Sequence, residues 1–331
     1  MIFLLTPIVL AAAAFLYQSI GAARDRRRYP PPGRLVDVNG TRLHVRELGR
    51  GEPTVVLESG IGASSLSWAK VQPAIAEFTR VVSYDRAGLG WSARAELPRS
   101  VPAMVDELHL LLSRVDAAPP FILVGHSFGG LLVRAYAGLY PHEVAGLVLL
   151  DPVSVVSWAN CSGHELAHLR MGVRLAKRGT WLARFGMVRA ALAVLAAGGR
   201  GVPKLASRAG GRRGAMAIAN MVGEVRKLPA EVWPLVRSHW SDPKCFRALS
   251  DYLQCLPESA RYASRIATAN GIPMIVMSAG TATPAELEER DKWVAESGAA
   301  KHIGVQDAGH WLQLERPDLV VEAIRQMAGK R

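Results

Sequence analysis

Short apolar runs alternate with longer stretches of helical pattern along much of this chain. Alternating apolar and polar positions at residues 35–38 and 43–48, joined by Asn39-Gly40, predict a β-hairpin. Four apolar runs follow, each separated from the next by enough residues for a helix, at residues 54–57, 81–84, 121–124 and 147–150. Strands and helices in alternation predict an α/β fold with a mostly parallel central sheet and helices on both of its faces.

This alternation stops after Asp151 and resumes with an apolar run at residues 273–277. The intervening residues 152–270 have helical periodicity, so we predict a helical insertion after the sixth strand. The insertion divides a core made of residues 34–151 and 271–331. The last part of the core should contain a helix near residues 284–296, a strand at 301–305, a loop and a terminal helix at 317–327.

The N-terminus is a continuous apolar segment. Residues 2–23 carry no charged side chain, and a helix of this length would be about 33 Å long, which matches the core of a bilayer. Arginines follow the segment and none precedes it, so we predict a transmembrane helix at residues 1–23 with the main domain on the cytoplasmic side. A basic, Pro-rich linker should follow at residues 24–33. A secretory leader that is cleaved near residue 23 is the alternative.

The charge distribution suggests where else the protein could meet a membrane. The formal net charge of the 331 residues is +12, and residues 170–213 contain many Lys and Arg but no Asp or Glu. This amphipathic, basic segment is either a solvated helix face or a surface that contacts anionic headgroups. No recognisable nucleic-acid-binding module accompanies it, so we expect no nucleic-acid partner. The three cysteines match no metal-ligand spacing and are expected to be reduced, buried thiols.

The strongest chemical signal is Gly125-His126-Ser127-Phe128-Gly129, between an apolar run and a helical pattern. Gly125 and Gly129 permit a sharp, strained turn that exposes the Ser127 hydroxyl. The Phe128 amide lies at the start of the next helix, where it can stabilise negative charge on an attacked carbonyl. We expect a nucleophilic serine here, with His126 pointing off the other side of the turn. A glycine-rich turn without chemistry is the alternative.

These residues resemble the α/β-hydrolase superfamily over roughly residues 34–327, and residues 152–270 are similar to the cap domain of that family. Glu58-Ser59-Gly60-Ile61-Gly62 is similar to the family's oxyanion loop, although Ser59 replaces the usual His. The resemblance implies that the Ile61 amide is the second oxyanion donor. The segment from Tyr84 to Ser92 looks like a structural loop of the family, which we expect an Asp85–Arg86 network to hold.

A serine nucleophile needs a base within hydrogen-bonding distance. The resemblance implies that His310, on a loop after the last strand, is this base, with His302 as a second candidate. A serine at position 127 argues against the dehalogenases and epoxide hydrolases of the family, which carry aspartate there.

The acid that orients the base is harder to assign. The family's usual position, after the seventh strand, corresponds to Thr283, which cannot stabilise an imidazolium ion. Some members of the family instead use an aspartate at the end of the sixth strand, and Asp151 occupies that position. The alternative is that Asp151 only caps the following turn, with Glu286 or Asp307 as the acid.

A competing motif is His164-Glu165-Leu166-Ala167-His168, which on a helix would place two imidazoles on one face, as in zinc proteases. A zinc site needs a third ligand. Met171 and Arg174 occupy the Gly and His positions of the longer form of the motif. We therefore expect neither a metal nor an organic cofactor.

Together, these features predict a serine hydrolase that cleaves carboxylic esters through an acyl-enzyme, with an apolar or lipid-like acyl substrate. The predicted site contains Ser127, His310 and Asp151, and an oxyanion hole formed by the amides of Ile61 and Phe128. A ligand-binding or scaffold protein without catalysis is the alternative function, because Thr283 and Ser59 depart from the family pattern.

Overall fold

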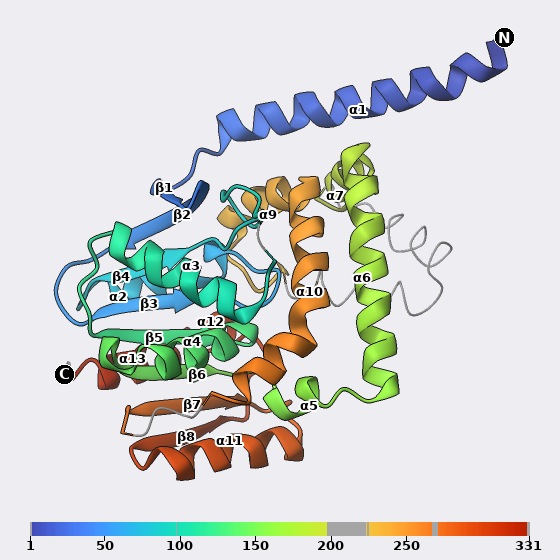
Figure 1. The fold of residues 1–331 in the computed structure, drawn as a ribbon. Coiled ribbons are helices and arrows are strands. Elements are labelled where there is room, and N and C mark those ends of the chain that lie inside the picture. The colour runs from blue at the N-terminus through green and yellow to red at the C-terminus, as the bar shows by residue number, and fades with distance from the viewer. Residues whose placement is uncertain (1, 97, 197–222, 224, 267–270, 330–331) are drawn as a thin grey trace.

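A computed structural model describes residues 2–96, 98–196, 223, 225–266 and 271–329 and contains an eight-stranded sheet (Figure 1). The strand order is β1-β2-β4-β3-β5-β6-β7-β8. The first two strands form an antiparallel hairpin and β2 is antiparallel to β4, whereas all other neighbours are parallel. The mostly parallel sheet predicted from the sequence is confirmed. The strands are β1 Arg34–Val38, β2 Thr41–Leu48, β3 Thr54–Glu58, β4 Val81–Tyr84, β5 Phe121–His126, β6 Val144–Leu150, β7 Met274–Ala279 and β8 Ala300–Val305.

The central strands are buried on both faces, which explains their continuous apolar sequences. Every residue of β3, β4, β5 and β7 is buried, whereas the edge strands β1 and β8 contain exposed positions. Helices α3 (Val101–Arg114), α4 (Phe128–Leu139) and α11 (Pro284–Ser297) contribute to the apolar core on one face. The core on the other face includes residues of η1 (Ser65–Trp68), α2 (Gln72–Ile75), α12 (Leu312–Glu315) and α13 (Pro317–Met327). The short η2 (Pro141–Glu143) precedes β6.

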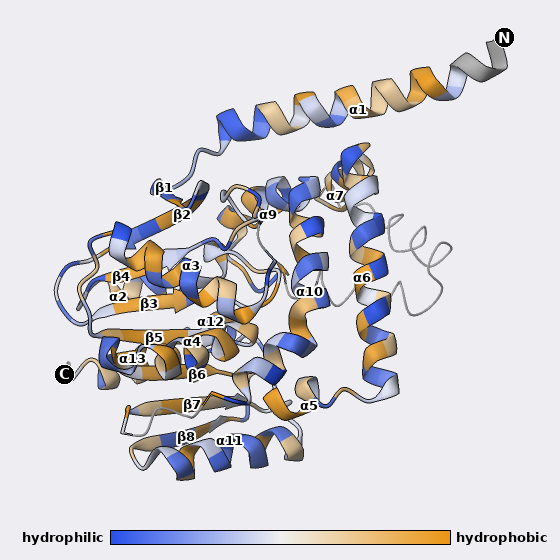
Figure 2. Ribbon diagram, in the orientation of Figure 1, coloured by the Kyte–Doolittle hydropathy of each residue, from blue (hydrophilic) through white to orange (hydrophobic). Residues whose placement is uncertain are grey.

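A helical cap domain is inserted between β6 and β7. Its helices are α5 Val155–Ala159, α6 Gly163–Arg184, α7 Met187–Ala196, η3 Ala230–Val232, α9 Trp233–Trp240 and α10 Pro243–Ala263. Helices α6 and α10 pack side by side beyond one end of the sheet, and polar and apolar residues alternate around both (Figure 2). Of the predicted basic segment at 170–213, residues 197–213 lie outside the described part of the chain. All three cysteines are unpaired: one is buried and two are half-buried.

Helix α1 (Ile2–Arg28) continues five residues beyond the predicted transmembrane segment (residues 24–28), so only residues 29–33 of the expected linker are non-helical. Among the described residues, α1 is the one single helix that is long and apolar enough to cross a membrane. Its N-terminal end projects beyond the rest of the molecule, and its C-terminal half lies over the cap domain (Figure 1). The Gln18 amide donates a hydrogen bond to the Ser241 carbonyl at 2.8 Å and fixes this half.

Candidate active site

The sharp turn between β5 and α4 places Ser127 in a strained conformation. Its backbone has φ 54° and ψ −119°, which non-glycine residues rarely adopt. Both flanking glycines are required by close packing, because a Cβ at Gly125 would lie 2.6 Å from the backbone of Gly129. A Cβ at Gly129 would lie 2.4 Å from the Glu58 carbonyl oxygen. The local sequence therefore dictates a turn that presents the serine hydroxyl at the end of the sheet.

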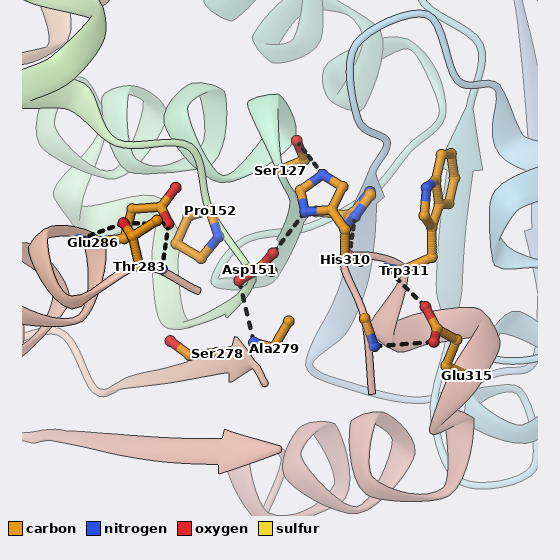
Figure 3. A network of polar contacts seen from close by, with 12 residues as sticks. Ser127, Asp151, Pro152, Ser278, Ala279, Thr283, Glu286, His310, Trp311 and Glu315 are labelled. Carbon is orange, nitrogen blue, oxygen red and sulfur yellow. Dashed lines mark hydrogen bonds and ion pairs between the residues drawn. The ribbon is translucent and has the colours of Figure 1, made fainter. Parts of the chain in front are cut away.

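The structure brings Ser127, His310 and Asp151 together from three separate segments (Figure 3). The Ser127 hydroxyl lies 2.9 Å from Nε2 of His310. Nδ1 of the same ring lies 2.6 Å from Oδ2 of Asp151, which follows β6. The serine is only 5% exposed, whereas the His310 side chain is 44% exposed. The arrangement can transfer a proton from the serine to the ring while the carboxylate orients that ring.

Asp151 is held as a carboxylate by neighbours that the sequence reasoning did not identify. Its Oδ1 accepts hydrogen bonds from the Arg290 guanidinium at 2.9 Å and the Ala279 amide at 3.2 Å. Burial raises the pKa of Asp151, but the hydrogen bond with His310 and the Arg290 charge outweigh burial and lower the pKa below its usual value. Arg290 belongs to no motif in α11, so only the folded structure reveals its role.

The alternative acids and base have other partners. Thr283 and Glu286 form a capping box at the start of α11, apart from His310 (Figure 3). Asp307 pairs with the Arg316 guanidinium at 2.6 Å. His302 lies between Asp291 and Ser278, at 2.6 and 2.7 Å from their side-chain oxygens. Among the described contacts, neither Glu286 nor Asp307 pairs with His310, and His302 has no hydrogen bond with Ser127.

The two predicted oxyanion donors belong to backbone segments next to Ser127. Phe128 is the first residue of α4, so its N–H has no acceptor within the helix. Ile61 lies in a turn closed by the Ala63 amide and the Gly60 carbonyl at 3.1 Å. A Cβ at Gly60 would lie 3.4 Å from Cβ of Ser127, so this loop passes directly beside the serine. The loop that carries Ile61 and the start of α4 are therefore both adjacent to Ser127.

Asp85 helps to hold the turn from Tyr84 to Ser92, as expected of a structural loop, but the expected joint network with Arg86 is wrong, because the two side chains bind different partners. Arg86 donates to the carbonyls of Ser59 and Gly60, each at 2.6 Å, and to the carboxylate of Glu58. Asp85 instead accepts hydrogen bonds from the backbone amides of Ser65 and Trp91. Through its bonds with the two carbonyls, Arg86 holds the backbone of the loop that carries Ile61.

His126 was expected to point away from the site, and this expectation is also wrong. Its Nε2 lies 2.8 Å from the His310 carbonyl oxygen, and its ring centroid is 4.8 Å from the His310 ring. Burial, with a smaller effect of His310, lowers the pKa of His126 to about 3, so the ring is neutral. A neutral ring donates its Nε2 proton to the carbonyl and leaves Nδ1, buried and without a hydrogen-bond partner, facing Gly60. His126 therefore supports the loop that carries His310.

Glu315 in α12 orders the same loop from the other side (Figure 3). Its carboxylate accepts hydrogen bonds from the amides of Gly309 at 2.9 Å and Trp311 at 3.3 Å, the two neighbours of His310. Lys227 of the cap domain donates to the same carboxylate at 2.9 Å. No local pattern in the sequence indicates this contact, because it depends on where α12 packs.

The zinc-protease motif lies on α6. The rings of His164 and His168 are 4.2 Å apart, and Glu165 closes the capping box with Ser162 at the start of the helix. Across the described parts of the chain, no group of three or more His, Cys, Asp or Glu side chains could hold a metal ion. In this structure the glutamate therefore has a local structural role.

Comparison with known proteins identifies the fold family. A family model described as the alpha/beta hydrolase fold matches residues 53–317. The chain belongs to the alpha/beta hydrolase family. Two solved members share the fold at low identity: the Cif epoxide hydrolase from Acinetobacter nosocomialis (14% identity, TM-score 0.71, 95% of this chain and 96% of that chain) and the enol-lactonase from Burkholderia xenovorans LB400 (18%, 0.61, 90% and 100%).

Curated relatives match over shorter segments. The 2-hydroxy-6-oxo-2,4-heptadienoate hydrolase of Pseudomonas putida is 35% identical over 131 residues, 37% of this chain and 45% of that protein. The protein YqjL of Bacillus subtilis is 34% identical over 116 residues, 35% of this chain and 46% of that protein. The chain thus matches less than half the length of these relatives.

Proposed function

We propose that this alpha/beta hydrolase cleaves carboxylic esters with Ser127 as nucleophile, His310 as base and Asp151 as the orienting acid. The continuous chain of hydrogen bonds from Ser127 through His310 to Asp151, at 2.9 and 2.6 Å, carries the proposal. Each distance lies within the range required for proton transfer or ring orientation.

The reaction follows from these positions. Ser127 Oγ attacks the ester carbonyl while Nε2 of His310 takes its proton, and the Ile61 and Phe128 amides stabilise the oxyanion. The imidazolium then protonates the leaving alcohol, and an acyl-enzyme remains. Water attacks this ester, His310 takes the proton of the water, and the acid product leaves as Ser127 regains its proton.

Esters of apolar or lipid-like acids are the proposed substrates. Two similar structures are those of an enol-lactonase and of an N-acyl homoserine lactone degrading enzyme. A lactone is a cyclic ester, so ring opening requires the same attack and the same oxyanion stabilisation. Other similar structures are those of epoxide hydrolases. A serine at position 127 favours acyl transfer over epoxide opening.

A non-catalytic role was considered because Thr283 and Ser59 depart from the family pattern. The place of Asp151 beside His310 supports the catalytic proposal. The Ser59 hydroxyl accepts a hydrogen bond from the Trp68 indole at 3.0 Å and donates to the Ser64 carbonyl at 3.1 Å. These contacts give Ser59 a structural role that is compatible with a working oxyanion loop.

We further propose that α1 anchors the protein in a membrane, with the catalytic domain on the cytoplasmic side. Gln18 and Asp25 both accept hydrogen bonds from Arg189 of the cap domain, at 3.0 and 2.5 Å. Cleavage near residue 23 would remove Gln18 and its hydrogen bond with Arg189. This contact supports a retained anchor over a cleaved leader. Intact-mass measurement of the membrane fraction tests this: the proposal requires the N-terminal residues to be present.

Labelling with a fluorophosphonate probe tests the catalytic proposal. Wild-type protein should be labelled and should hydrolyse p-nitrophenyl esters, whereas Ser127→Ala should do neither while it retains its circular dichroism spectrum. Ser113→Ala, at an exposed position of α3, is the matched control and should retain both. Persistent labelling of Ser127→Ala would overturn the assignment, and turnover across acyl chain lengths defines the substrate.

A further inference from the structure

A cavity of about 310 Å³ lies beneath the C-terminal end of α1, between this helix, the β1–β2 hairpin, the loop after β4 and the cap domain. It shares no lining residue with the serine site. Cationic side chains line it from three directions: Arg26 from α1, Arg42 from β2, and Arg189 and Lys244 from the cap domain. Trp91 contributes an aromatic wall.

The acidic residues of the cavity are already engaged. Asp25 accepts a hydrogen bond from Arg189 at 2.5 Å. Asp242 caps α10 by accepting from the Lys244 amide at 2.9 Å, while the Lys244 ammonium donates to the Ser92 carbonyl at 2.7 Å. Four cations face two carboxylates, so the lining retains a positive charge. A cavity with this balance favours an anionic ligand.

The lining of the cavity also contains a histidine that is largely buried. His239 is 9% exposed, and its Nδ1 is buried without a hydrogen-bond partner. Burial lowers its pKa to about 4, so the ring is neutral near pH 7. The ring as a whole contributes to the lining, where its centroid lies 4.4 Å from that of the Trp91 ring. A neutral imidazole can donate one hydrogen bond to a phosphate oxygen.

The position of the cavity along α1 indicates where the ligand comes from. Ala22, Asp25 and Arg26 line it, which is where the apolar part of the helix gives way to arginines. In a membrane-spanning helix this transition lies at the level of the headgroups. The hydrogen bonds of Gln18 with Ser241 and Arg189 hold the helix against the cap domain.

We propose that this cavity binds the phosphate-bearing headgroup of an anionic phospholipid. The inference rests on the proposed membrane attachment and is independent of the proposed ester hydrolysis. The phosphate would contact the guanidinium groups and His239, and the cation of a zwitterionic headgroup would be repelled by the same lining. Binding should weaken with ionic strength, because part of the lining is exposed.

Calorimetric titration of the full-length protein in neutral detergent tests the proposal. The ligands are the short-chain lipids dihexanoyl-phosphatidylglycerol and dihexanoyl-phosphatidylcholine, and inorganic phosphate. We expect the anionic lipid to bind at least about tenfold more tightly than either of the other two. Equal binding of the two lipids would overturn the proposal. Binding of inorganic phosphate as tight as that of the anionic lipid would overturn the lipid as the source of the ligand.

Variants localise the binding. Arg42→Gln, at an exposed position of the hairpin, and His239→Phe should each weaken binding of the anionic lipid about tenfold. Arg114→Gln removes one exposed arginine from α3, outside the cavity, and should leave the affinity unchanged. Wild-type affinity in Arg42→Gln would place the lipid elsewhere and overturn the proposal. Ser127→Ala should bind normally, which separates this result from failure of the catalytic proposal.

Discussion

Two buried aspartates in this molecule each bind Nδ1 of a histidine, yet only one of the two pairs belongs to the proposed catalytic site. Asp85 lies 2.9 Å from His44, and both side chains are completely buried. Asp151 lies 2.6 Å from His310, whose side chain is 44% exposed. The distance between carboxylate and ring is therefore similar in both pairs and does not by itself identify a candidate for catalysis.

The two pairs differ in what faces the second ring nitrogen, Nε2. Nε2 of His44 faces the Pro32 carbonyl at 3.4 Å, whereas Nε2 of His310 faces the Ser127 hydroxyl at 2.9 Å. Asp85 also accepts hydrogen bonds from the Ser65 and Trp91 amides, so it connects β2, the start of η1 and the loop after β4. An Asp–His pair becomes a candidate for catalysis only where the second nitrogen meets a hydroxyl and a substrate can approach.

Exchanging each aspartate for asparagine should separate the two roles most clearly. Asp151→Asn should lower kcat for a p-nitrophenyl ester by about 1,000- to 10,000-fold, because the amide cannot stabilise the imidazolium or fix its tautomer. Asp85→Asn, assayed per folded molecule, should stay within about threefold of wild type. Comparable kcat values for the two variants would contradict the comparison.

The free energy of unfolding should rank the two variants in the opposite order, with the larger loss in Asp85→Asn. Burial raises the pKa of Asp85, but its bonds with His44 and backbone amides lower it to about 2. A depressed pKa means that the stabilisation is present above the unfolded pKa near 4 and is lost as the pH falls toward 2. Asp85→Asn should lower the free energy of unfolding by about 2 kcal/mol at pH 7, with a smaller deficit near pH 3, in urea titrations. Asp307→Asn, at an exposed position, is the control.

Removal of the carboxylate that supports the loop of His310 should have a smaller effect on kcat. Glu315→Gln removes the charge that binds the amides on both sides of His310 and should lower kcat about tenfold with little change in KM. Glu288→Gln, an exposed carboxylate on α11, is the matched control. An unchanged kcat in Glu315→Gln would show that the loop keeps its geometry without this carboxylate.

The smallest expected change is a shift of the pH profile. Arg290→Gln removes a positive charge beside Asp151, which should raise the pKa of Asp151, so that the orienting carboxylate is protonated at a higher pH. The acid limb of the kcat/KM profile should then move to higher pH, so the loss of activity is greatest under mildly acidic conditions. Lys292→Gln removes an exposed charge from the same helix and should leave the limb in place.

The order of strands and helices could be predicted because each element carries its own periodicity. The runs at 54–57, 121–124 and 147–150 were expected as buried strands, and β3, β5 and β6 contain them. The terminal helix predicted at 317–327 matches α13 at both ends. Here proline at the helix start and the apolar spacing act over a few residues, within the reach of local sequence.

The supporting contacts could not be predicted in the same way. Arg290, Glu315 and His126 carry no signature, because their roles depend on which loop their side chains meet after packing. Arg86 was assigned to its sequence neighbour, although it binds backbone carbonyls more than twenty residues earlier in the chain. The direction of a side chain at the end of a strand depends on the register of that strand, and this register is set by the whole sheet.

Local sequence by itself determined the strained serine turn, the parallel sheet, the inserted helices and the apolar helix at the N-terminus. Tertiary structure alone decided that Asp151, 159 positions before His310 in the chain, is the carboxylate that meets its ring. It also decided that the cap domain holds α1 through Arg189. Short-range periodicity and turn chemistry are properties of neighbouring residues, whereas these contacts exist only once the sheet has fixed where distant loops end.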